Sequence, residues 1–121
     1  MKNRTFDLIV YGATSFVGQI LTRYLFEHIG VGGKVNWAIA GRSEKKLAVL
    51  KSSLGSNADS LSVIVADASD EVALTTMCQS ARVIASTVGP YALYGEPLVK
   101  ACAENGTDYC DLCGEAYWIK A

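Results

Sequence analysis

A short segment bounded by two glycines lies near the start of the chain, between an apolar run and an amphipathic segment. Residues 6–11 form the apolar run and are predicted to be a buried strand, and residues 16–29 carry apolar side chains at helical spacing. The segment between them is Gly-Ala-Thr-Ser-Phe-Val-Gly, residues 12–18. A glycine-bounded turn after a strand and before a helix is typical of phosphate-binding loops. It favours an α/β fold in which the helix packs back onto a sheet.

The rest of the chain continues this alternation of strands and helices. Further strands are predicted at 35–40, 61–66, 82–87 and 107–112. The helices between them are predicted to begin after Ser43, after Ser69 or Asp70, and at Glu96-Pro97. Residues 115–121 are predicted to be the start of another helix. Such alternation implies parallel pairing and right-handed crossovers. We therefore expect one Rossmann-type domain over residues 1–121, a doubly wound parallel sheet of order 3-2-1-4-5 with helices on both faces.

The composition is that of a globular domain with a packed core. Half of the 121 residues are hydrophobic, and the formal net charge is −1. No basic stripe is present, so nucleic acid is not an expected partner. No apolar run reaches the roughly 18 residues of a membrane span, and the first residues lack the apolar segment of a signal peptide. We expect a cytoplasmic protein without a transmembrane segment.

The four cysteines do not form a recognisable metal site. Cys110 and Cys113 make a single CxxC pair, and the only histidine, His28, falls in a predicted helix. A thioredoxin-like motif would stand in a different sequence context. The sequence therefore predicts four free thiols, including Cys78 and Cys102, and no bound metal.

The glycine-bounded loop has the features of a pyrophosphate site. Gly12 permits a tight turn, and Gly18 allows the following helix to pack close to the sheet. Ser15 stands where many such loops have a central glycine, so it either donates its hydroxyl to phosphate or only crowds the loop. A plain structural turn is the alternative. The predicted anion contacts are the backbone amides of Thr14, Ser15, Phe16 and Val17.

The end of the second predicted strand indicates which dinucleotide binds. An acidic residue there would bind the ribose 2′-hydroxyl, whereas an arginine accepts a 2′-phosphate. Arg42 occupies this position with no Asp or Glu beside it, Ser43 adds a hydroxyl, and Lys45 or Lys46 can add charge. The sequence therefore predicts NADP as cofactor, the alternative being a solvated arginine at a helix start.

Two further strand ends supply the remaining predicted cofactor contacts. Asp67 and Ala68 follow the third strand, where the adenine ring is expected to lie. Asp67 could accept from the adenine amino group or could cap the next helix. Thr87, Val88 and Gly89 follow the fourth strand, at the topological switch point where the nicotinamide half is expected. A strand-ending turn is the alternative for this second segment.

Four segments together resemble the saccharopine dehydrogenase-like oxidoreductases, and in particular that family's NADP-binding domain. These segments are residues 11–18, 37–42, 88–96 and 108–115. Trans-acting enoyl reductases show a similar pattern. The resemblance implies a Rossmann domain followed by a substrate domain, an NADP(H) or NAD(H) cofactor and hydride transfer. The chain would then be the N-terminal fragment of a larger two-domain enzyme.

Three function hypotheses remain open at this point. The first is an oxidoreductase whose small-molecule substrate is held by a missing C-terminal domain, and the second is a non-catalytic NADP-binding or interaction module. The third, a short-chain dehydrogenase, would need a Tyr-x-x-x-Lys pair, and none of Tyr24, Tyr91, Tyr94 and Tyr117 has Lys four residues on. No catalytic residue is identified, and a homodimer stays an open alternative because the sheet has exposed edges.

Overall fold

The predicted five-stranded sheet is confirmed. The computed structural model describes residues 5–31, 33–67, 69–86 and 95–111, with side chains omitted at 95–99 and 110–111. All four strand pairings are parallel, and the order is β3-β2-β1-β4-β5. The strands are β1 (Phe6–Tyr11), β2 (Trp37–Gly41), β3 (Ser62–Val65), β4 (Ala81–Ser86) and β5 (Asp108–Asp111).

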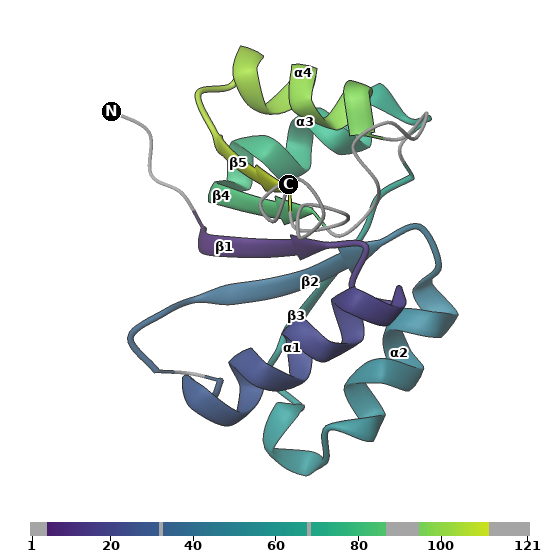
Figure 1. The fold of residues 1–121 in the computed structure, drawn as a ribbon, viewed down its shortest axis with the longest axis vertical. Coiled ribbons are helices and arrows are strands. Elements are labelled where there is room, and N and C mark those ends of the chain that lie inside the picture. The colour runs from purple at the N-terminus through teal and green to yellow at the C-terminus, as the bar shows by residue number, and fades with distance from the viewer. Residues whose placement is uncertain (1–4, 32, 68, 87–94, 112–121) are drawn as a thin grey trace, which may run out of the picture.

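The helices cover the two faces of this sheet in pairs (Figure 1). One pair lies against β1, β2 and β3, and the other lies against β4 and β5. This division follows from the right-handed crossovers, which reverse direction between β3 and β4. The first pair is α1 (Phe16–His28) and α2 (Glu44–Ser53), the second is α3 (Glu71–Ser80) and α4 (Gly95–Glu104), and a short 3₁₀ turn, η1, spans Ser56–Ala58.

Polar side chains define where the first three helices begin. Ser15, Ser43 and Asp70 precede α1, α2 and α3, and each side chain accepts a hydrogen bond from the backbone amide three residues on. These bonds satisfy donors that the first turn of a helix leaves without an intrahelical acceptor. The sequence left Ser69 and Asp70 as alternative caps for α3, and Asp70 is the one that caps it.

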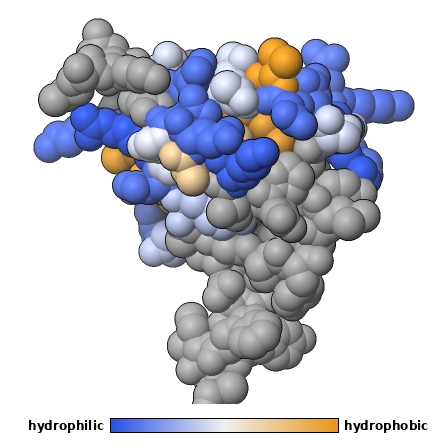
Figure 2. All heavy atoms as spheres, turned by 90° about the horizontal axis from the view of Figure 1, so that it is seen from above, coloured by the Kyte–Doolittle hydropathy of each residue, from blue (hydrophilic) through white to orange (hydrophobic). Residues whose placement is uncertain are grey.

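Two hydrophobic cores lie on opposite faces of the sheet. The α1–α2 core contains Val10, Ala13, Trp37, Ile39, Leu47, Leu50, Leu54, Ala58 and Leu61. The α3–α4 core contains Ile9, Tyr11, Ala38, Ala40, Ala66, Leu74, Met77, Cys78, Ala81, Ile84, Ala101 and Cys102. Successive residues of a strand point to opposite faces, so β1 and β2 contribute to both cores. Seen from the side of α3 and α4, the described surface is largely hydrophilic with scattered apolar residues (Figure 2).

Three predicted strands begin one or two residues later than expected, and in β2 and β5 polar side chains hold the residues that come before the strand. The second strand was expected from residue 35, but Asn36 donates its backbone amide to the Asp7 carboxylate and β2 begins at Trp37. The fifth was expected from Thr107, whose buried hydroxyl donates to the Cys78 carbonyl at the end of α3. The helix predicted over residues 115–121 lies outside the described residues.

The thiols that the structure describes agree with the prediction of free cysteines. Cys78 on α3 and Cys102 on α4 are buried thiols that form no disulfide, and their sulfur atoms lie 3.4 Å apart. The hydrogen bond with the Cys78 thiol, and then burial, raise the pKa of the Cys102 thiol well above its usual range. The side chains of Cys110 and Cys113 lie outside the described residues. Among the residues that are described, no group of three His, Cys, Asp or Glu side chains could hold a metal ion.

Candidate functional site

The glycines of the phosphate loop have the roles that the sequence predicted. Gly12 follows β1 with a φ of 80°, a backbone conformation that residues other than glycine rarely adopt. A Cβ atom on Gly18 would lie 2.2 Å from the Gly12 carbonyl oxygen and 2.7 Å from the Ala13 Cα. Both contacts are with backbone, so only glycine lets the first turn of α1 lie this close to the loop. The close approach directs the N-terminus of α1 at the space beyond the end of β1.

The loop uses Ser15 differently from either sequence-based interpretation. Its hydroxyl oxygen accepts from the Gly18 amide at 3.0 Å, which caps α1, and its own amide donates to the Gly12 carbonyl at 3.0 Å. The prediction that the Ser15 amide points at an anion is therefore wrong, because the turn already uses it. The amides of Phe16 and Val17 stand in the first helical turn, where helix geometry provides no intrahelical acceptor and the helix dipole favours negative charge.

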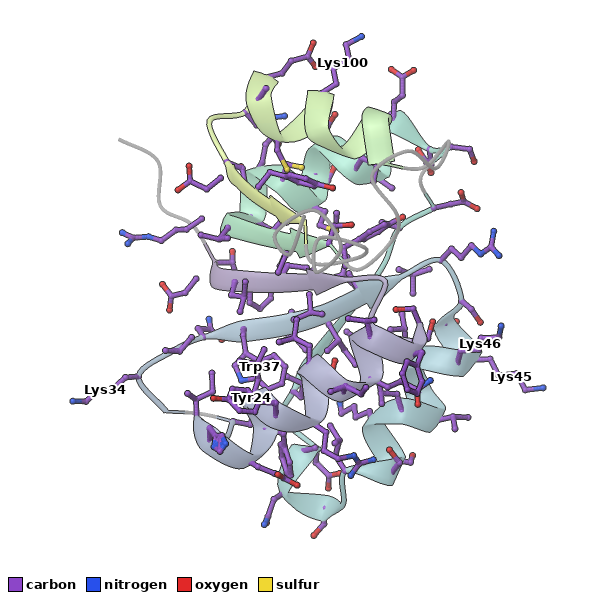
Figure 3. All side chains as sticks on the ribbon, viewed as in Figure 1. Tyr24, Lys34, Trp37, Lys45, Lys46 and Lys100 are labelled. Atoms are coloured by element: carbon purple, nitrogen blue, oxygen red, sulfur yellow. The ribbon has the colours of Figure 1, made fainter. Side chains whose placement is uncertain are left out.

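The residues at the end of β2 place positive charge beside this loop. Arg42 directly follows Gly41 and is exposed, and Ser43 accepts from the Lys46 amide to cap α2. Lys45 and Lys46 stand in the first turn of α2, and their side chains extend away from the sheet (Figure 3). A cation at the strand end and two more on the next helix make this corner of the molecule attractive to an anion.

Asp67 follows β3 and is kept as a carboxylate. One of its oxygens accepts from both the amide and the hydroxyl of Ser69, each at 3.0 Å. These two hydrogen bonds, and more weakly the charge of Arg42, hold the pKa of Asp67 below its usual range. Asp67 does not cap α3, since Asp70 does. Its side chain is exposed beside the strand ends, which is compatible with the predicted acceptor role toward adenine.

Tyr11 is a site-adjacent residue that sequence reasoning did not single out. It is the last residue of β1, is only 4% exposed, and donates its hydroxyl to the Ala66 carbonyl at 2.9 Å. Burial, and then the negative charge of Asp67, raise the pKa of Tyr11 to about 12, against a smaller opposing effect of Arg42. The one available signal was a tyrosine that follows the aliphatic residues 8–10 at the end of the strand.

The predicted cofactor residues that the structure describes gather at one edge of the sheet. The loop of residues 12–18, the pair Arg42 and Ser43, and Asp67 follow the ends of β1, β2 and β3, which are parallel neighbours. The carboxyl ends of parallel strands share an edge, which is where open α/β sheets bind ligands. The remaining predicted contacts, Ala68, Thr87, Val88 and Gly89, lie outside the described residues.

A groove of about 710 Å³ between α1 and α2 adjoins this edge. Thr14 of the phosphate loop lines it, together with three cationic side chains, Arg23, Lys45 and Lys46, and none of the described lining residues is a carboxylate. Arg23 also donates to the Ser53 hydroxyl at 3.3 Å. The positive charge near Arg42 therefore continues along the surface between the two helices.

Among the described helices none is both long and apolar enough to cross a membrane.

A parallel sheet of this order, with a glycine-bounded loop leading into α1 and a cation after β2, defines a dinucleotide-binding Rossmann domain. Comparison with known families agrees with this class. Residues 8–121 match the model of the saccharopine dehydrogenase NADP-binding domain. The chain therefore belongs to the saccharopine dehydrogenase NADP-binding domain family.

Individual relatives and solved structures are also similar to this chain. The trans-acting enoyl reductase of Mycobacterium bovis is 46% identical over 117 residues, which are 97% of this chain and 27% of the relative. Saccharopine dehydrogenase (L-Glu forming) from Saccharomyces cerevisiae superposes with a TM-score of 0.67 at 18% identity, over 88% of this chain and 21% of that one. The NADPH complex of an Escherichia coli quinone oxidoreductase gives 0.63 at 22% identity, over 83% and 34%. The two structural likenesses support the fold.

Proposed function

We propose that this chain is the NADP(H)-binding part of an oxidoreductase that transfers hydride between the nicotinamide and a small-molecule substrate. The observation that carries the proposal is the position of Arg42. It stands at the end of β2, beside the phosphate loop, where an NAD-specific domain would have a carboxylate. The family match to an NADP-binding domain supports the same assignment.

Each part of the nucleotide has a matching group at the strand ends. The first-turn amides of Phe16 and Val17 suit the pyrophosphate, and Thr14 borders the same space. Arg42 and Ser43 suit the 2′-phosphate through a planar guanidinium and a hydroxyl. The contacts predicted from the sequence for the other parts are Asp67 and Ala68 for adenine, and Thr87, Val88 and Gly89 for the nicotinamide half. When bound, NADPH supplies the hydride.

The relatives suggest a reaction class. Curated relatives that are 44–46% identical to this chain are named trans-acting enoyl reductases, so reduction of a carbon–carbon double bond next to a carbonyl is the first reaction to test. The chain spans about a quarter of the length of these curated relatives. We propose that residues beyond the matched region hold the substrate. The alternative is a module that binds NADP and catalyses nothing, which a turnover assay separates from the enzyme.

The decisive experiment compares nucleotide affinities by calorimetry. The wild-type chain should bind NADPH at least about tenfold more tightly than NADH, because a hydrogen bond to a charged group contributes about 1.5–3 kcal/mol. Arg42→Ala should remove most of this preference and leave NADH binding nearly unchanged. Lys34→Ala is the matched control, since Lys34 is an exposed cation at the other end of β2 (Figure 3). Equal affinities of the wild-type chain for the two nucleotides would contradict the assignment.

A further inference from the structure

The segment that follows β3 is held from two other strands. The Ala66 amide donates to the Gly41 carbonyl at the end of β2, at 2.8 Å. The Ala66 carbonyl accepts from the Tyr11 hydroxyl at the end of β1, at 2.9 Å. Both backbone polar groups of Ala66 are therefore fixed, and the next residue is Asp67. The peptide units on both sides of Ala66 are therefore each held by a hydrogen bond, which restricts the backbone from which Asp67 continues.

The Tyr11 hydrogen bond spans the width of β2. In the pairing of β1 with β2, the residue opposite Tyr11 is Ala40, whose side chain is a single methyl group. Tyr11, Ala40 and Ala66 all belong to the α3–α4 core. A larger residue at position 40 would occupy the space that the tyrosine ring crosses. Tyr11 also directly precedes Gly12, so one residue links the phosphate loop to the segment after β3.

We propose that Tyr11 is a positioning residue for the adenosine half of the nucleotide: its hydroxyl fixes the Ala66 carbonyl and so holds Asp67 where it accepts from the adenine amino group. This inference rests on the proposed function. Ser69 restrains the same carboxylate from the other side, through its amide and its hydroxyl. Asp67 is thus held through its preceding peptide and through its own side chain. The Tyr11 hydroxyl is protonated at neutral pH, as that of any tyrosine is, and burial raises its pKa further, to about 12.

The test is a double-mutant cycle on NADPH affinity with the four chains wild type, Tyr11→Phe, Asp67→Ala and the double variant, because alanine removes the acceptor oxygen that asparagine would keep. Tyr11→Phe removes one hydroxyl and should raise the Kd for NADPH about three- to tenfold. Because Tyr11 acts through Asp67, the same change in the Asp67→Ala background should alter Kd less than about twofold. Independent, multiplying effects of the two substitutions would overturn the proposal.

A second readout separates positioning from a general loss of stability. The hypoxanthine analogue of NADPH has oxygen in place of the adenine amino group and cannot donate from that position to Asp67. Tyr11→Phe should therefore weaken the binding of NADPH more than the binding of the analogue. Ser69→Ala should change the two affinities in the same direction as Tyr11→Phe does. Equal weakening of both nucleotides, or no change in either, contradicts the inference.

Tyr24→Phe is the matched control, because Tyr24 is exposed on α1 and its substitution removes the same group. It should leave both affinities unchanged, whereas a change as large as that of Tyr11→Phe would contradict a specific role for Tyr11. A wild-type chain that binds neither nucleotide would refute the proposed function itself. That outcome differs from one in which the wild type binds and Tyr11→Phe has no effect, which refutes only the role of Tyr11.

Discussion

At the scale of single residues, the loop between β1 and α1 shows how far chemistry can be inferred from residue types. The roles of Gly12 and Gly18 were predictable, because each depends on the absence of a side chain at a fixed place in a strand–turn–helix unit. The role of Ser15 was not. A serine hydroxyl at this position can accept from the helix and also donate to a phosphate. That it caps α1 depends on its distance from the Gly18 amide, which is 3.0 Å.

Gly18→Ala tests whether the close approach of α1 to the loop is required. The added Cβ would meet backbone at 2.2 Å, so the helix must shift. We expect a net destabilisation of about 1–3 kcal/mol from overpacking, although alanine favours helices by up to about 1 kcal/mol. NADPH affinity should fall as well, because the shift moves the first-turn amides.

Gly41→Ala is the control for that substitution. A Cβ there would lie at an ordinary 3.6 Å from the Leu47 side chain, so chemical denaturation should show a much smaller effect. A Gly18→Ala variant as stable as the wild type, with the same affinity for NADPH, would show that the loop tolerates a side chain at this position.

At the scale of secondary-structure elements, strand and helix existence followed from hydrophobic periodicity, while boundaries depended on tertiary contacts. The strand expected from residue 35 begins at Trp37, because Asn36 bonds to Asp7, which is 29 positions away in the chain. The strand expected from Thr107 begins one residue later, because the Thr107 hydroxyl donates to the Cys78 carbonyl of α3. Side-chain partners so distant in the chain are invisible to a local pattern. The same applies to Tyr11, whose partner is 55 positions away.

The segment between β3 and α3 provides a prediction that separates stability from binding. Asp70 caps α3 through the Ala73 amide, so Asp70→Ala should destabilise the protein by about 0.5–2 kcal/mol. It should leave the Kd for NADPH unchanged, because Asp70 makes no predicted contact with the nucleotide. Thermal unfolding followed by circular dichroism, together with calorimetry, measures both effects.

Asp70→Asn and Ser69→Ala are the two controls for this prediction. Asp70→Asn preserves a capping oxygen and should restore most of the stability. Ser69→Ala should show the opposite pattern, with stability nearly unchanged and NADPH binding weakened, because Ser69 bonds to Asp67. If Asp70→Ala and Ser69→Ala changed stability and NADPH affinity in the same way, helix capping and nucleotide binding would not be separate roles of these two residues.

At the scale of the whole molecule, the topology was predictable because few arrangements satisfy strand–helix alternation with right-handed crossovers. The arrangement of three strand ends then brings residues 12–18, 42 and 67 to one edge, although they are far apart in sequence. The cytoplasmic location, the homodimer and the division into two domains stay predictions. Substrate recognition could not be predicted, since the relatives share only 27% of their length with this chain.

The 121-residue chain should bind NADPH without consuming it. Hydride transfer needs a substrate held about 3–3.5 Å from the nicotinamide, and we propose that residues beyond the matched region provide that hold. Binding should change NADPH fluorescence, while its absorbance stays constant when a short enoyl thioester is added. Steady, substrate-dependent loss of absorbance, from protein free of host reductases, would instead show that these residues complete an active site.

The two cores on opposite faces of the sheet have a consequence for the order in which the protein is built. Every residue assigned to the α1–α2 core falls between positions 10 and 61, whereas the α3–α4 core joins Ile9 on β1 to Cys102 on α4. During synthesis the N-terminal half leaves the ribosome first. It can therefore bury one face of β1 before α3 and α4, which cover the other face, have been synthesised. The exposed face of β1 and β2 is then the surface on which the second half of the chain assembles.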